Sequence, residues 1–564
     1  MPRSRCSLPV VALSLLLLSL LQATAEAADG DFELHIVHLN DFHARFEPIN
    51  SGGGSCSPSA ACFGGIARVA TEARQLIDAA GDNYLFLNAG DNFQGTVWYS
   101  LYKWNVTAAI LNMLPWDAAT LGNHEFDDKI AGLVPFLDNI NFPMVVANLD
   151  ISQEPRLTGK FNKSVVIERG GRRIGIVGYM LRSTPDIAST EKLIFLDEAE
   201  SLAEEAKRLK EDGVDIIIGL SHSGLDVDRQ VAAKVADVDI IVGGHSHTLL
   251  YTGTPPDNDT AEDVYPVMVT QESGHKVAIV QAMAYTKYLG NLVATFDSNG
   301  ELLSATGNPV LLDETVEEDP EILAALAPWQ AGLEELETRK VGETKVLLDT
   351  SNNACKQGEC NMGNFITGAM LDEMAVLQSS SDSQRWTEAP IAITNSGGIR
   401  ASIEETNNGT ITYSDLITVL PFENTIDIIE ITGATLRKAL EFSVNDTNTW
   451  KSKRQGPLYF RYLLHYSGLR VEIDVRQPVG QRVTRVSVLC AACNVPRYEP
   501  LKDDAWYRVA VNSFLAEGGD AFYMLRDEAR SRTIGRVDVD VMLDYMARFS
   551  PIVQGLDGRT VVLS

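Results

Sequence analysis

Histidine, aspartate and asparagine recur in five short motifs in the first half of this chain. The motifs are Asp41-Phe42-His43, Gly90-Asp91-Asn92, Gly122-Asn123-His124-Glu125-Phe126-Asp127, Ser221-His222 and Gly243-Gly244-His245-Ser246-His247. Five of the 9 histidines in the 564-residue chain lie in them, and histidines of a packed core would not cluster in this way. Imidazole and carboxylate groups are the ligands that zinc-like ions prefer. Two such ions can activate a water molecule for in-line attack on phosphorus.

The ligand candidates divide into two sets that share one carboxylate. The first set is Asp41, His43, Asp91 and His247, and the second is Asp91, Asn123, His222 and His245. Asp91 would bridge the two metal ions. We expect zinc, with calcium, magnesium and manganese as the alternatives.

A catalytic pair is predicted beside these ligands. His124 follows Asn123 directly, and Asp127 lies three residues further along the chain. An imidazole held by a carboxylate is oriented and kept cationic, which suits it to stabilise phosphoryl oxygens or to protonate a leaving group. The alternative for Asp127 is a helix N-cap or a surface acid.

The acidic composition narrows the classes of partner. The formal net charge is −29 at pH 7, and nucleic acid and anionic membranes both favour basic proteins, so neither is expected as a partner. A phosphate substrate would also be repelled unless metal ions or local Arg and Lys reverse the field at the site. The length predicts two or more globular domains.

The first half of the chain alternates β-branched runs with helical stretches, which is typical of an α/β fold with buried strands. The predicted strands are 34–39, 84–87, 145–147, 173–177, 214–220 and 238–242, and the predicted helices include 66–79 and 199–211. Each ligand candidate lies at the carboxyl end of a predicted strand or in the following loop, where open α/β sheets bind their ligands.

The pattern changes between residues 314 and 340, where apolar residues follow helical spacing between acidic flanks. Pro328 interrupts this segment, so a kinked helix or two short helices should link two domains. The first domain is predicted over 28–313, and a second α/β domain over 341–564. The strands predicted there are 391–394, 426–431, 469–473 and 505–511, with helices 364–374 and 539–549.

Both ends of the chain indicate release from the cell. Two arginines precede the apolar run 10–21, and small residues follow it, so residues 1–27 are predicted to be a secretory signal. The alternative is a retained anchor, although the run is short for crossing a bilayer. The last residues, 558–564, lack the hydrophobic tail of a lipid-anchor signal. We therefore expect a secreted, extracellular protein without a membrane anchor.

Cysteine usage fits an oxidising compartment. After the signal, six cysteines remain in three close pairs, Cys56 with Cys62, Cys355 with Cys360, and Cys490 with Cys493. We predict three local disulfides, although six cysteines allow fifteen connectivities, and the alternative for the last pair is a redox or zinc motif. Sequons at Asn105, Asn162, Asn258, Asn408 and Asn445 predict a glycosylated surface.

The motifs taken together resemble those of a known family. The five motifs of the first half resemble the calcineurin-like metallophosphoesterases. The second half resembles the 5'-nucleotidase C-terminal domain through Glu359-Cys360-Asn361-Met362-Gly363-Asn364, Thr394-Asn395-Ser396-Gly397-Gly398-Ile399-Arg400, Pro421-Phe422, Ser467-Gly468-Leu469-Arg470 and Gly518-Gly519-Asp520. The likeness covers nearly the whole mature chain, which is similar to the 5'-nucleotidase/apyrase family.

The resemblance implies a four-layer α/β/β/α metallophosphatase domain with two metals, and a C-terminal domain that binds the nucleoside and rotates to admit substrate. The residues expected to contact substrate are Lys356, Asn395, Arg400, Phe422, Phe514 and Asp520. The two phenylalanines should sandwich the base, because nucleobases stack on aromatic faces. Asn395 and Arg400 should contact the base or the phosphate, and Asp520 should contact the ribose hydroxyls. Vertebrate relatives carry Arg where this chain has Lys356, which keeps the charge but loses the bidentate fork.

Three activities are consistent with this resemblance. The first is a secreted apyrase that removes phosphate from ATP and ADP, as in the soluble salivary apyrases of blood-feeding arthropods, and the missing anchor favours it. The second is a 5'-nucleotidase that converts AMP to adenosine. The third is a non-enzymatic nucleotide-binding relative, which the intact ligand set and His124 disfavour. The sequence leaves open whether the protein is a monomer or a homodimer.

Overall fold

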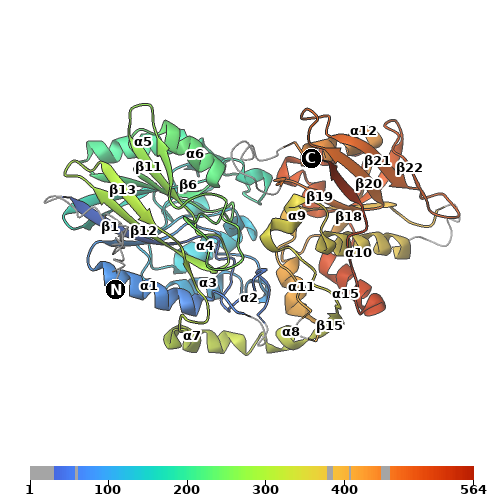
Figure 1. Ribbon diagram of the computed structural model, residues 1–564, viewed down its shortest axis with the longest axis horizontal. Helices are drawn as coiled ribbons and strands as arrows, with labels where there is room; N and C mark the ends of the chain where they lie inside the picture. The colour runs from blue at the N-terminus through green and yellow to red at the C-terminus, as the bar shows by residue number, and fades with distance from the viewer. Residues whose placement is uncertain (1–30, 57–60, 378–384, 406–407, 446–457, 564) are drawn as a thin grey trace, which may run out of the picture.

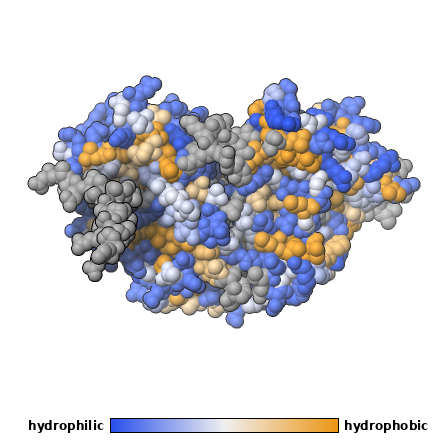
Figure 2. Space-filling view, in the orientation of Figure 1, coloured by the Kyte–Doolittle hydropathy of each residue, from blue (hydrophilic) through white to orange (hydrophobic). Residues whose placement is uncertain are grey.

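The computed structural model describes residues 31–56, 61–377, 385–405, 408–445 and 458–563, so the predicted signal, 1–27, lies outside the described residues. Two domains lie side by side, and helices α7 (Pro320–Gln330) and α8 (Glu334–Thr338) run along one side of both (Figure 1). Hydrophilic residues cover most of the face shown in Figure 2, with hydrophobic residues in separate patches. None of the described helices combines the length and apolarity needed to cross a bilayer.

Two sheets form the centre of the N-terminal domain. The first has the order β13 (Leu302–Gly307), β12 (Tyr288–Phe296), β1 (Phe32–Leu39), β2 (Tyr84–Asn88) and β3 (Ala118–Ala119), with β14 (Val310–Leu311) paired to β12. The second has the order β10 (Val267–Thr270), β11 (Lys276–Val280), β9 (Ile240–Val242), β8 (Ile216–His222), β6 (Arg172–Met180) and β5 (Ser164–Arg169). Apolar side chains of both sheets, including Leu34, Ile36 and Ile218, form one buried core between them.

Helices cover the outer faces of the two sheets. Helix α1 (Ile66–Ala80) packs against β1, β2 and β12, whereas α5 (Glu198–Glu211) and α6 (Leu225–Lys234) pack on the second sheet (Figure 1). The apolar residues of α1 recur at helical spacing and are buried, and this amphipathic pattern explains why the helix lies on a sheet. The predicted four-layer α/β/β/α architecture is therefore confirmed.

The C-terminal domain is also α/β. Its larger sheet has the order β19 (Leu464–Ser467), β16 (Ile391–Asn395), β23 (Trp506–Asn512), β18 (Ile426–Thr432) and β24 (Ser531–Thr533), and its smaller sheet has the order β22 (Tyr498–Pro500), β21 (Val483–Leu489), β20 (Leu469–Asp474) and β25 (Thr560–Leu563). Helix α10 (Asn361–Leu377) packs between the larger sheet and α15 (Asp538–Phe549), and α12 (Gly433–Ser443) contacts both sheets. The three predicted disulfides are present.

Two predicted features differ from the structure. Residues 145–147 form no strand, because Val145 N–H bonds to Ala119 O beside the first sheet while Ala147 N–H bonds to Gly178 O in the second. The segment thus crosses between the sheets instead of extending either. In the linker, two helices form as predicted, but Pro328 lies inside α7 and the break comes after Gln330. The other predicted strands and helices are confirmed, with small shifts at their ends.

Parallel pairing aligns the strands that carry the ligand motifs. In the first sheet β1, β2 and β3 run parallel, and in the second β6, β8 and β9 run parallel. The carboxyl ends of parallel strands meet at one edge of a sheet, so the loops after β1, β2, β3, β8 and β9 converge. Four of these loops hold a motif, and the fifth motif, Ser221-His222, forms the carboxyl end of β8 itself.

Candidate active site

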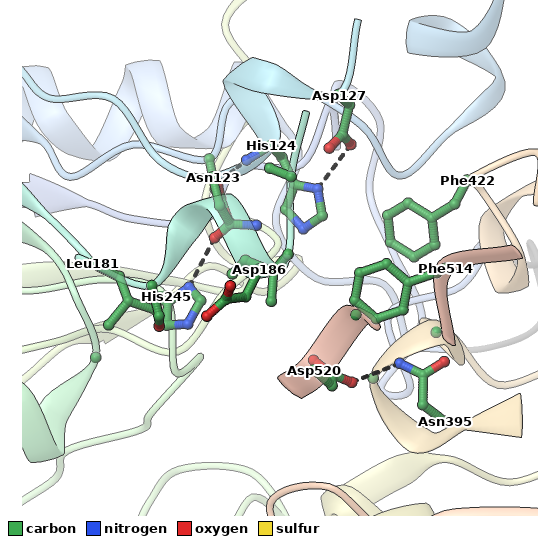
Figure 3. A pocket seen from close by; sticks show the side chains of 18 of the residues that line it. Asn123, His124, Asp127, Leu181, Asp186, His245, Asn395, Phe422, Phe514 and Asp520 are labelled. Carbon is green, nitrogen blue, oxygen red and sulfur yellow. Dashed lines mark hydrogen bonds and ion pairs between the residues drawn. The ribbon is translucent and has the colours of Figure 1, made fainter. Parts of the chain in front are cut away.

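A cavity of about 990 Å³ lies between the two domains. Its lining includes, from the N-terminal domain, Asp91, Asn123, His124, Asp127, His245 and His247, and from the C-terminal domain, Lys356, Asn395, Arg400, Phe422, Phe514 and Asp520 (Figure 3). Asp41, His43 and His222 are buried beneath the N-terminal wall, in contact with these ligand candidates. The fold thus brings every predicted site residue to one place.

The first predicted ligand set forms a compact group. Each of its four residues offers one potential ligand atom, and these atoms lie within 4.8 Å of one another. The residues are Asp41, His43, Asp91 and His247. The Nε2 atoms of His43 and His247 are 3.1 Å apart. Burial lowers the pKa of both imidazoles, which favours the neutral, metal-binding form of each ring. Two imidazole nitrogens and two carboxylates in one small space are a donor set that fits a metal ion.

The second set shares Asp91, as predicted. His222 Nδ1 donates to Ala89 O at 2.6 Å, which directs Nε2 toward Asp91 Oδ2 at 3.0 Å. That buried Nε2 also lies 3.9 Å from Asp41 Oδ1, so it faces two carboxylates. Burial lowers the pKa of His222, but the carboxylates of Asp91 and Asp41 outweigh it and raise the pKa to about 10. A buried nitrogen in this negative field fits a second divalent cation.

His245 and Asn123 complete the second set. His245 Nδ1 lies 2.8 Å from Asn123 Oδ1 (Figure 3), and His245 belongs to the same group of possible ligand atoms as Asp91 and His222. Burial lowers the pKa of His245 well below its usual value, so the ring is neutral and its nitrogen lone pair is free for a metal.

Left-handed backbone conformations are concentrated among the ligand candidates. Asp41, His43, Asp91, His245 and His247 all have left-handed φ angles, between 49° and 74°. Non-glycine residues adopt this region rarely, at a cost on the order of 1–3 kcal/mol each, and they concentrate at functional sites. The surrounding structure must therefore hold the loops in place.

Glu125 provides part of that support, and the sequence analysis assigned it no role. Its buried carboxylate accepts backbone N–H groups from Gly122 at 2.5 Å, Asp91 at 3.0 Å, Asn92 at 2.6 Å and Phe93 at 3.2 Å. Burial raises its pKa to about 7, and the nearby Asp91 charge adds to the effect. Its place in the Gly-Asn-His-Glu motif was the available signal.

We predict that Glu125→Ala lowers the free energy of unfolding by ~2–4 kcal/mol and weakens metal binding, because buried N–H groups lose their acceptor. Urea unfolding and metal analysis would measure both effects. Glu205→Ala is the control, since this buried carboxylate bonds to Ser164 and Arg208 on the outer side of the second sheet. It should cost stability but leave metal content unchanged. Normal metal affinity in Glu125→Ala would contradict the role given to Glu125.

The predicted catalytic pair is formed. His124 Nδ1 and Asp127 Oδ2 are 2.8 Å apart (Figure 3), and the backbone N–H of His124 donates to Asp91 Oδ1 at 2.8 Å. Burial lowers the pKa of His124, but the charges of Asp127 and Asp91 outweigh it, so the pKa is raised. The imidazole is stacked on Phe422, with ring centroids 5.4 Å apart. His124 thus lies between the ligand group and the aromatic wall, and its raised pKa favours the protonated ring.

Two polar groups of the opposite wall are joined. Asn395 Nδ2 donates to Asp520 Oδ2 at 2.8 Å (Figure 3), and Asn512 Nδ2 donates to Asn395 Oδ1 at 3.0 Å. This chain of bonds orients the Asp520 carboxylate, which can accept hydrogen bonds from a ligand. Gly519 keeps this turn close to Phe514, because a Cβ atom at position 519 would lie 2.6 Å from the Phe514 ring.

Basic side chains extend from the C-terminal domain toward the ligand group. Arg400 Nη2 lies 3.3 Å from His43 Nε2, and its Cζ atom lies 5.6 Å from the centroid of Phe422. Lys356 Nζ lies 5.7 Å from the centroid of Tyr459, another residue of the cavity wall. In a chain of net charge −29, these cations place positive charge on the C-terminal wall of the cavity, where an anion could bind.

Comparisons with known proteins agree with this geometry. The calcineurin-like phosphoesterase family matches residues 34–249, and the 5'-nucleotidase C-terminal domain matches residues 340–527. An apyrase of Tabanus yao is 46% identical over 536 residues, which are 94% of this chain and 94% of that protein. The 5'-nucleotidase of Homo sapiens is 40% identical over 547 residues, which are 96% of this chain and 93% of that protein.

A solved structure extends the agreement to the arrangement of the domains. The crystal structure of a 5'-nucleotidase precursor from Thermus thermophilus has a TM-score of 0.83 at 36% identity, covering 94% of this chain and 99% of that chain. Residues of both matched domains thus line one cavity. The chain belongs to the 5'-nucleotidase family, which includes apyrases, and is a phosphoric-ester hydrolase that acts on nucleotides.

Proposed function

We propose that this protein is a secreted, zinc-dependent apyrase that releases phosphate from ATP and ADP. The observation that carries the proposal is the cavity itself, which has metal-ligand candidates and the His124–Asp127 pair on one wall and aromatic and cationic side chains on the other. A nucleotide fits this division, with its terminal phosphate toward the ligands and its base and ribose toward the C-terminal domain.

Each predicted ligand set would hold one ion, with Asp91 shared between them. Bound there, two divalent ions would neutralise charge on the phosphate and lower the pKa of water. The mixture of imidazole, carboxylate and amide ligands favours zinc. His124, oriented by Asp127, donates a proton or a hydrogen bond to an oxygen of the reacting phosphate.

The C-terminal wall would position the nucleotide. Phe422 and Phe514 extend into the cavity (Figure 3), and stacking on them would bind the base. Asp520, held by Asn395, would accept a hydrogen bond from a ribose hydroxyl. Arg400 and Lys356 would pair with phosphate oxygens. Arginine offers a planar fork of donors for this, whereas lysine provides a single point charge.

Secretion rests on separate observations. The predicted signal lies outside the described residues, but the disulfides and the exposed sequon at Asn105 fit an oxidising, extracellular environment.

A 5'-nucleotidase that converts AMP to adenosine is the second candidate. It is favoured by relatives of that name, such as those from Homo sapiens and Bos taurus, each 40% identical to this chain.

Phosphate release from ATP, ADP and AMP, measured in parallel on the mature protein, would test the proposal. We expect rapid release from ATP and ADP that stops at AMP. A chelator should abolish the release and added zinc should restore it, with calcium, magnesium and manganese compared in the same assay. Fast release from AMP would make the protein a 5'-nucleotidase, and full activity in the chelator would refute the metal-dependent mechanism.

A further inference from the structure

A short loop of the C-terminal domain brings another cation to the cavity. Within residues 458–463, Phe460 and Leu463 are buried in the domain core, whereas Arg461 and Tyr462 are half-buried and line the cavity. Phe460 N–H donates to Lys356 O at 2.8 Å. The two buried side chains and this bond hold Arg461 beside the Lys356 segment.

Arg461 has no counter-charge within the part of the chain that the structure describes. Its guanidinium contacts the neighbouring Tyr462 ring, with Cζ 5.3 Å from the centroid, and no described carboxylate forms a salt bridge with it. Several other arginines of the domain do pair with carboxylates, such as Arg532 with Asp427. A half-buried cation that lines a cavity without a carboxylate partner is available to an anionic ligand.

The charge of Arg461 acts on one group of each wall of the cavity, His245 and Asp520. Burial is the largest cause of the lowered pKa of His245, and the charge of Arg461 lowers it further. Burial also raises the pKa of Asp520, and the charges of Lys356 and Arg461 oppose that rise. Arg461 is therefore near enough to influence both a metal-ligand candidate and the proposed ribose contact.

The length of the phosphate chain decides what a cation at this position can bind. With the terminal phosphate at the ligand group, AMP has no further phosphate on the ribose side, whereas ADP has one and ATP has two. We propose that Arg461 binds a non-terminal phosphate and so selects nucleoside di- and triphosphates over AMP. This inference rests on the proposed nucleotide hydrolysis and names the residue that would set its substrate class.

Arg461→Ala should lower kcat/KM for ADP and ATP about 10- to 100-fold, the range expected when a charge-assisted hydrogen bond is lost. Any kcat/KM for AMP should stay within about twofold, because AMP has no phosphate at this position. Arg461→Lys should be intermediate, since it keeps the charge and loses the planar fork. Calorimetry on the holoenzyme should show weaker binding of α,β-methylene-ADP but unchanged binding of adenosine.

Arg470→Ala is the matched control. Arg470 belongs to the same domain and contacts a tyrosine in the same way, with Cζ 4.5 Å from the Tyr498 centroid, but it is exposed on β20 and does not line the cavity. The Arg470→Ala variant removes the same charge and should leave kcat/KM for ATP, ADP and AMP and the binding of α,β-methylene-ADP unchanged.

The outcomes separate this inference from the proposed function. Equal losses for ADP and AMP in Arg461→Ala, or no loss for ADP, would overturn the inference while the apyrase proposal stands. A wild-type protein that cleaves only AMP would refute the apyrase proposal. In that case, selective loss of α,β-methylene-ADP binding in Arg461→Ala would still support the phosphate contact.

Discussion

Asp91→Asn should lower kcat about 10⁴-fold, equivalent to ~5 kcal/mol, and reduce the bound metal from about two ions per chain to about one or none. Asp91 is the one residue common to both groups of possible ligand atoms. An amide has no charge to share between two cations. Asparagine still offers an oxygen to His124 N–H, which now bonds to Asp91 Oδ1, so the loop should keep its conformation.

Metal analysis and steady-state phosphate release would measure this effect, with thermal unfolding to verify the fold. Asp239→Asn is the control. Asp239 is also buried and accepts the Ile217 N–H at 2.8 Å, but it lies at the opposite end of the strand that leads to His245. It should keep both metals and normal kcat. A doubly loaded Asp91→Asn protein with near-normal kcat would show that this carboxylate is not the bridge.

The ligand set was predictable because it is a property of strand ends. Asp41 and Asp91 follow neighbouring parallel strands of the first sheet, and His222 ends a parallel strand of the second. Parallel strands bring such positions to one edge, whatever the loops do. The residue types therefore predicted metal binding, and the parallel strands predicted that these residues lie close together.

The support around the ligands was not predictable in the same way. Tyr285 N–H donates to Asp41 O at 2.8 Å, and its ring contacts both His43 and His247, yet it is more than 240 residues from Asp41 and belongs to no metal-ligand motif. The left-handed φ angle of residues such as His245 was not predictable either, because Asp and His adopt this region only in a minority of cases. These features depend on tertiary contacts.

The C-terminal wall shows the limit of reasoning from motifs. Phe422 and Phe514 read as ordinary core residues without the family resemblance, although both line the cavity. Arg461 was missed because no motif surrounds it, and its significance comes from a loop anchored by Phe460. Crossings between sheets, as at residues 145–147, are hidden from the sequence for the same reason, because periodicity does not say which partner a strand will find.

His124→Ala should reduce kcat about 10²- to 10⁴-fold while nucleotide binding, measured with α,β-methylene-ADP, stays within about tenfold. The backbone N–H of residue 124 still reaches Asp91 Oδ1 in this variant, so the ligand group should keep its metals. The substitution removes the imidazole ring and therefore its bond to Asp127 and its stacking on Phe422.

Asp127→Asn tests whether the pair acts as a unit. It should lower kcat less than His124→Ala does, since the ring remains but loses the charge that raises its pKa. The double variant should be no slower than His124→Ala alone. Additive losses would mean that Asp127 acts independently of His124. His35→Ala is the control, because this ring lies in β1 and bonds to Glu33 outside the cavity.

The leaving group then distinguishes the two chemical roles open to His124. Cleavage of ATP or ADP expels a phosphate oxygen that is stable as an anion near neutral pH, whereas cleavage of AMP expels a ribose alkoxide that needs a proton. If His124 is the proton donor, His124→Ala should slow any release from AMP far more than release from ADP. Equal losses on both substrates would instead assign the ring to charge stabilisation on the phosphoryl oxygens, where the transferred group is the same in every substrate.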